Sequence, residues 1–140
     1  MLKRIALSLV FTCSFLLASL SAHAQQFNVL LFTKTNGWHH EAINEGVDAL
    51  RELAVRHHFA VDWQEDSSVF TDEKLKKYQV VIFLLTTGDI LNDEQQAAME
   101  RFIRSGKGFV GIHSASDTEY DWDWYTKMVG RTFHIHPEIQ

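Results

Sequence analysis

The sequence contains one cysteine, Cys13, among 140 residues. It lies in an apolar run, residues 5–20, that follows the basic start MLKR and precedes the small-residue segment Ala22-His23-Ala24. This order is typical of a secretory signal peptide, and we predict cleavage after residue 24. The remaining chain, 25–140, would carry no thiol, which excludes disulfides and cysteine nucleophiles. We therefore expect a periplasmic or secreted protein.

Basic residues are also fewer than acidic ones. The sequence has 13 Lys and Arg and 18 Asp and Glu, which gives a formal net charge of −5. Losing Lys3 and Arg4 with the signal would make the chain more acidic still. This balance disfavours nucleic acid and anionic membrane surfaces as partners and suits a neutral or cationic ligand. The apolar run is short for a span of about 20 residues, so we expect no membrane span after cleavage.

Neither internal repeats nor low-complexity linkers interrupt residues 25–140, which indicates one small domain. Apolar runs alternate with amphipathic or capped segments, and continuously apolar strands are typical of a parallel sheet covered on both faces. We expect an α/β fold with strands at 27–32, 59–63, 80–85 and 109–112, helices at 43–57, 71–77, 92–105 and 121–129, and the start of a fifth strand at 131–135.

A parallel sheet predicts where the functional site lies. Ligands of such folds bind outside the carboxyl ends of the strands. The segments 33–41, 86–91 and 113–117 follow three predicted strands and should meet there. They hold His40 and His113, and the second of these sits at the sharp end of the run GFVGIHSASD, residues 108–117.

Three stretches, 30–43, 80–130 and 133–137, resemble the trehalose-utilisation (ThuA-like) family. That family is similar in fold to the class I glutamine amidotransferases. The resemblance therefore implies a flavodoxin-like three-layer sandwich with a mostly parallel sheet, and a link to the use of sugars. Because family members extend well beyond residue 140, it also implies that 25–140 corresponds to the N-terminal part of such a domain, truncated at its C-terminus.

The amidotransferase comparison bears on the chemistry at the strand end. Those enzymes carry a Gly-x-Cys-x-Gly turn after a strand, and the matching stretch here is Gly111-Ile112-His113-Ser114-Ala115. With His113 at the nucleophile position, glutamine hydrolysis through a thioester is excluded by that route.

The resemblance maps three family-like histidines onto His40, His113 and His136. Neutral imidazoles at one rim suit either a divalent metal such as zinc or proton transfer on a sugar near neutral pH. No HExxH or CxxC spacing favours the metal. Asp117 is a third catalytic candidate that would ligate, orient His113 or bind a sugar hydroxyl, although it would equally cap the following turn.

Candidate sugar-binding residues are Trp38, Ser114 and Trp122. Trp38 stands beside the His40 turn and offers an aromatic face to a sugar ring. Trp122 belongs to 119–125, where aromatics alternate with carboxylates as in glycan sites, but a helix packing its rings on the sheet explains that pattern equally well. Ser114 is a donor in a turn rather than a nucleophile.

Taken together, these features predict an exported ThuA-like domain for a trehalose-type disaccharide or derivative. Its reaction would be hydrolysis or isomerisation, and the alternative is a non-catalytic sugar-binding or scaffold module. Apolar surface on 80–85 or 109–112 should be poorly covered if the sheet stops early, so we also expect a homo-oligomer.

Overall fold

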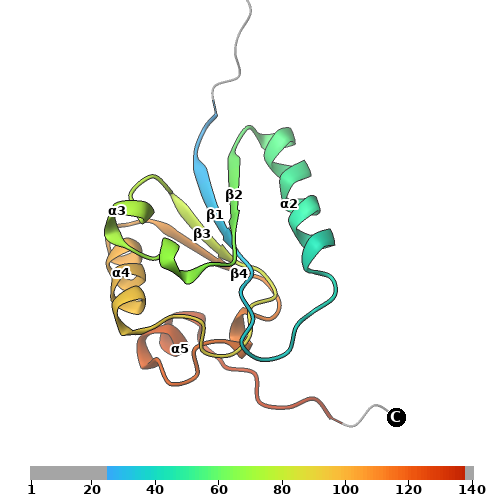
Figure 1. Cartoon of the computed structure of the whole chain (residues 1–140), viewed down its shortest axis with the longest axis vertical. Helices are drawn as coiled ribbons and strands as arrows, with labels where there is room; N and C mark the ends of the chain where they lie inside the picture. The colour runs from blue at the N-terminus through green and yellow to red at the C-terminus, as the bar shows by residue number, and fades with distance from the viewer. Residues whose placement is uncertain (1–24, 138–140) are drawn as a thin grey trace, which may run out of the picture.

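The structure is a computed structural model that describes residues 25–137. The predicted signal peptide, 1–24, and residues 138–140 lie outside the described residues. Strands and helices alternate along the chain (Figure 1). Their bounds are β1 Asn28–Phe32, α2 Ile43–His57, β2 Ala60–Gln64, η1 Ser67–Val69, α3 Asp72–Leu75, β3 Val80–Phe83, α4 Asp93–Arg104, β4 Gly108–Gly111, η2 Ala115–Asp117 and α5 Asp123–Val129.

The four strands form one parallel sheet in the order β2-β1-β3-β4. This matches the first four positions of the flavodoxin-like order 2-1-3-4-5. The central strands β1 and β3 pair from Val29 with Val80 to Phe32 with Phe83. The predicted α/β class and parallel sheet are thus confirmed.

Alternate side chains of β1 face opposite layers, because successive strand residues point to opposite sides of a sheet. Val29 and Leu31 pack with Ile43 and Val47 of α2. Leu30 and Phe32 belong to a second core with residues from α3, α4 and α5. Figure 1 shows α2 on one side of the sheet and α3, α4 and α5 on the other, which makes three layers.

Helix starts follow the sequence signals. Thr71 caps α3 by accepting a hydrogen bond from the backbone N–H of Lys74. Asn92 and Gln95 form a reciprocal capping box at the start of α4, with both bonds at 3.0 Å. Two backbone donors that the helix leaves free are satisfied this way, and α4 therefore begins where the sequence predicted.

The predicted fifth strand at 131–135 is wrong, since residues 131–137 form no strand or helix. The segment is instead tied to the loop around η2. The Phe133 N–H donates to the Ser116 carbonyl at 2.8 Å, and the Tyr120 hydroxyl donates to the Phe133 carbonyl at 3.0 Å. These bonds hold the segment at the end of the sheet rather than at its edge, so His134 and His136 do not share a strand face.

One strand is incompletely covered, as the sequence analysis expected. The run 80–85 is almost entirely buried, but Val110 on the edge strand β4 is 43% exposed. Within residues 25–137, β4 pairs with β3 alone, and an open strand edge that carries an exposed apolar side chain favours association between chains. Of the two runs between which the sequence analysis left the choice open, 109–112 is therefore the less covered one and 80–85 is buried.

Val110→Lys should reduce concentration-dependent self-association of the protein, because a lysine on an edge strand opposes edge-to-edge pairing. The change should alter the free energy of unfolding by about 0.5 kcal/mol or less at so exposed a position. Static light scattering across a concentration series measures the association. Val55→Lys is the control, since Val55 on α2 is 79% exposed and away from the sheet edge. Equal association of both variants would contradict a role for β4.

Candidate functional site

The loops after β1, β3 and β4 meet at one edge of the sheet. An isolated parallel bridge joins Thr35 to Thr87, and another joins Gly88 to Thr118. The Leu85 N–H donates to the His113 carbonyl at 2.8 Å. These contacts confirm that 33–41, 86–91 and 113–117 converge at the carboxyl ends of the strands.

A pocket of 290 Å³ opens at this junction. It combines two aromatic side chains, three histidines, one aspartate and two serines. Its lining is Trp38, His40, His113, Ser114, Ser116, Asp117, Phe133 and His136. All of the sequence-predicted site residues except Trp122 are present.

His40 and His113 face each other across the pocket although they are far apart in the chain. Their ring centroids are 5.1 Å apart and the rings are inclined by 70°. Burial lowers the pKa of His40 below its ordinary value of 6.5, the nearby His113 lowers this pKa further, and Asp117 partly opposes both. His40 is therefore neutral at pH 7 and able to accept a proton.

Two loop contacts orient the Trp38 turn. The Thr87 hydroxyl donates to the Trp38 carbonyl at 2.8 Å, and the Gly37 N–H donates to the Thr87 carbonyl at 3.3 Å. The Trp38 side chain itself is 74% exposed. A fixed backbone thus presents an open aromatic face at the pocket. His39 turns elsewhere, with Nδ1 at 3.2 Å from the Thr35 hydroxyl.

Asp117 lies in the pocket but is already engaged. Its carboxylate accepts a hydrogen bond from the Tyr120 hydroxyl. Burial, and next this bond to Asp117, raise the pKa of Tyr120 to about 12, so Tyr120 stays protonated and keeps donating. Sequence reasoning singled out the segment containing Tyr120 but missed this role and missed Phe133.

Trp122 does not line the pocket. Its ring stacks on Tyr125 at 5.7 Å with an inclination of 16°, and it packs against the core beneath α5. Of the two interpretations of Trp122, the structure therefore agrees with packing on the core rather than with a place in the pocket.

The three metal candidates His40, His113 and His136 all line the pocket. Within residues 25–137, however, no three His, Cys, Asp or Glu side chains are grouped to hold one ion. The His136 ring lies against Phe133, at 4.7 Å between centroids. This placement does not support the metal interpretation over proton transfer, and zinc binding stays a prediction.

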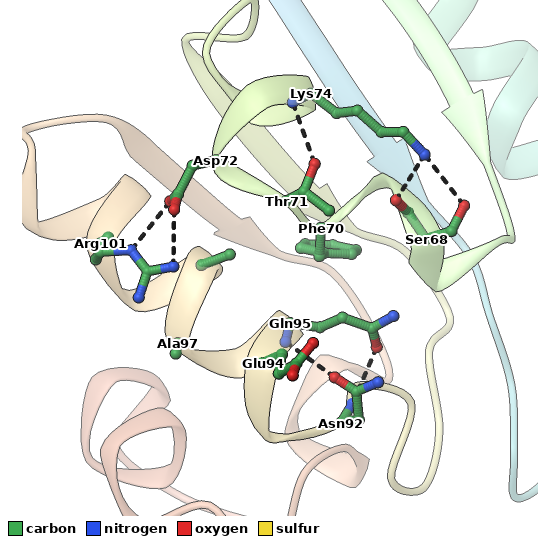
Figure 2. A pocket seen from close by; sticks show the side chains of 11 residues that line it. Ser68, Phe70, Thr71, Asp72, Lys74, Asn92, Glu94, Gln95, Ala97 and Arg101 are labelled. Atoms are coloured by element: carbon green, nitrogen blue, oxygen red, sulfur yellow. Dashed lines mark hydrogen bonds and ion pairs between the residues drawn. The ribbon is translucent and has the colours of Figure 1, made fainter.

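A larger groove of 730 Å³ runs between α3 and α4 (Figure 2). Several of its polar side chains are already engaged in hydrogen bonds within the groove. Arg101 donates to both carboxylate oxygens of Asp72 at 3.0 and 2.9 Å, and the Lys74 ammonium donates to the Ser68 carbonyl at 2.8 Å. Because Arg101 and Asp72 neutralise each other and Lys74 is bonded to Ser68, these groups are less available to a ligand, and we assign the functional site to the histidine pocket.

Comparison with known proteins agrees with this fold. The family model described as "Trehalose utilisation" matches residues 28–140. The chain belongs to the trehalose-utilisation (ThuA) family. The family resemblance noted in the sequence is thereby confirmed.

A solved structure of a ThuA-like protein from Bacteroides uniformis ATCC 8492 is similar to this ThuA-family chain, with 27% sequence identity and a TM-score of 0.64. The alignment covers 78% of this chain and 45% of that protein. The chain thus spans less than half the length of that relative. No curated protein matched the sequence. Within the described residues, no helix is long and apolar enough to cross a membrane.

Proposed function

We propose that this ThuA-family protein is exported and acts on a trehalose-type disaccharide or an oxidised derivative through the pocket at the sheet edge. The observation that carries the proposal is that His40 and His113 lie in edge-to-face contact in a pocket that the exposed Trp38 also lines. Export is supported by the signal pattern at 1–24, and the family supports the link to trehalose.

The pocket chemistry suits proton transfer on a sugar. His40 is neutral because burial and His113 lower its pKa, so it accepts a proton from a bound hydroxyl or C–H group. Asp117 opposes the lowering of the His40 pKa, which means that it stabilises the imidazolium of His40 once it forms. Hydrolysis or isomerisation of a sugar derivative both need such a step.

The pocket also suits a small polar ligand in size and character. Its volume of 290 Å³ is at the lower end of small-molecule pockets, which start at about 300 Å³. An exposed tryptophan offers a flat apolar surface, while histidine and carboxylate groups bind hydroxyls. The acidic net charge of −5 supports a neutral sugar rather than nucleic acid or a phosphorylated ligand.

The test compares variants of the full-length protein for binding and turnover of trehalose and of its oxidised derivatives. Trp38→Ala should weaken binding by about fivefold to tenfold, since an aromatic contact contributes on the order of 1 kcal/mol. His113→Ala should lower turnover by at least about 100-fold. Calorimetry measures binding and product chromatography measures turnover.

His57→Ala is the matched control, because His57 is an exposed histidine at the end of α2. This variant should bind and react like the wild type. Trp38-dependent binding without turnover would replace the enzyme proposal with the sugar-binding module. Binding and turnover that are indifferent to both Trp38 and His113 would refute the site.

A further inference from the structure

Ser114 lines the pocket but is largely buried, and its hydroxyl lies between two hydrogen-bond partners. Only 5% of the surface of Ser114 is exposed. The hydroxyl oxygen lies 3.1 Å from the Thr86 carbonyl oxygen and 3.0 Å from Nε2 of His40. The serine thus connects the end of β3 to a histidine that is 74 positions away in the sequence.

Counting protons decides the direction of these two bonds. A serine hydroxyl carries one hydrogen, and a backbone carbonyl is only an acceptor. The Ser114 hydrogen is therefore donated to Thr86. The second bond then needs its hydrogen from the histidine, so Nε2 of His40 is protonated and donates to the serine oxygen.

A neutral imidazole carries one N–H, so protonation at Nε2 leaves Nδ1 of His40 with a free lone pair. Among residues 25–137, nothing forms a hydrogen bond to this Nδ1. When His40 takes up a proton, Nε2 keeps its hydrogen and the new one is placed on Nδ1. The bond to Ser114 persists in both states.

We propose that Ser114 is a positioning residue that holds neutral His40 in the Nε2–H tautomer and so leaves the lone pair of Nδ1 as the acceptor that a ligand can use. The use of Nδ1 on a sugar rests on the proposed function. The tautomer itself is a property of the protein without ligand, and it is tested without one.

The competing arrangement would make Ser114 a nucleophile activated by His40. That arrangement requires the hydroxyl hydrogen to point at Nε2, which would leave the carbonyl of Thr86, a residue with no exposed surface, without this donor. A serine that is 5% exposed also offers little access to a ligand carbon. Burial and proton count both favour the positioning role.

The experiment is two-dimensional ¹H–¹⁵N NMR of the histidine rings in the full-length protein, recorded above the pH at which His40 titrates. Signals of His40 are assigned by their loss in His40→Gln. In the wild type, Nε2 should show the shift of a protonated nitrogen and Nδ1 that of an unprotonated one. The excess of this tautomer should be about fivefold to tenfold, as expected for one hydrogen bond.

Ser114→Ala should shift His40 toward a mixture of tautomers, and Ser114→Thr, which keeps a hydroxyl, should restore the wild-type pattern. Ser116→Ala is the matched control, since Ser116 lines the same pocket and its side chain makes no bond to His40. Circular dichroism confirms that each variant is folded.

A wild-type His40 protonated at Nδ1 would overturn the inference, as would a tautomer that Ser114→Ala leaves unchanged in a folded protein. Neither result bears on sugar binding, so failure here is distinguishable from failure of the proposed function. Conversely, an enzyme inactive on all sugars would leave the NMR pattern as predicted.

Discussion

Glu119→Ala should lower the free energy of unfolding by about 2–5 kcal/mol, because it would leave two buried backbone donors without a partner. Glu119 is 1% exposed. One carboxylate oxygen accepts the N–H groups of Ile90 and Leu91, both at 2.8 Å, and the other accepts the Gln96 amide at 2.6 Å. Urea denaturation followed by tryptophan fluorescence measures the loss.

Glu119→Gln is the matched control, since its carbonyl oxygen still accepts both backbone N–H groups. We expect it to lose less than half as much stability as Glu119→Ala. Equal losses would show that the charge or the second oxygen of the carboxylate, and not its acceptance of the two backbone N–H groups, accounts for the effect.

Comparison of the wild type with Glu119→Gln also tests the charge state of Glu119. Burial raises the pKa of Glu119 above its ordinary value of 4.5, the hydrogen bonds from Leu91, Ile90 and Gln96 oppose this, and Asp89 adds to it. The folded protein therefore holds this proton more tightly than the unfolded chain. Relative to Glu119→Gln, wild-type stability should be greatest below pH 4.5 and fall as pH rises through the folded pKa.

Gly88→Ala should destabilise the protein by about 2–4 kcal/mol and weaken ligand binding in the pocket. Gly88 has φ of +73°, and an added Cβ would lie 3.0 Å from the backbone nitrogen of Gly37. The left-handed conformation costs an alanine about 1–2 kcal/mol. The steric contact would in addition displace the loop that carries Trp38.

Gly106→Ala separates these two costs. Gly106 has a similar φ of +91°, but nothing lies within 4 Å of an added Cβ. This variant should show only the conformational cost and keep the pocket intact. Thermal unfolding and sugar calorimetry on both variants measure the difference. Identical behaviour would mean that the close approach of Gly88 to Gly37 has no structural role.

Much of the fold was predictable because it depends on local periodicity. Apolar runs marked all four strands to within a few residues, and the spacing of Ile43, Val47 and Ala54 marked the buried face of α2. Both patterns extend over a few residues, and they arise because a parallel sheet is buried on both faces. Because the carboxyl ends of parallel strands meet at one edge, the sequence also predicts that His40 and His113 lie at the same rim.

The segment 119–125 shows where this reasoning stops. Its alternating aromatics and carboxylates suggested a glycan site, yet Glu119 turns inward at φ of +55° and Trp122 packs on Tyr125. No periodicity governs a loop, and residue type alone does not say whether a carboxylate meets water or buried N–H groups. The strand prediction for 131–135 was wrong for the same reason, because the backbone of this segment forms its hydrogen bond with the η2 loop rather than with a strand.

The sequence by itself thus determined the α/β class, the helix caps and the edge of the sheet at which the polar residues gather. Only the tertiary structure decided that Ser114 bonds His40, that Tyr120 engages Asp117 and that Phe133 lines the pocket. Periodic elements are specified by residues that are neighbours in the chain. A pocket between loops depends on side-chain directions set jointly by segments tens of residues apart, and no local pattern encodes them.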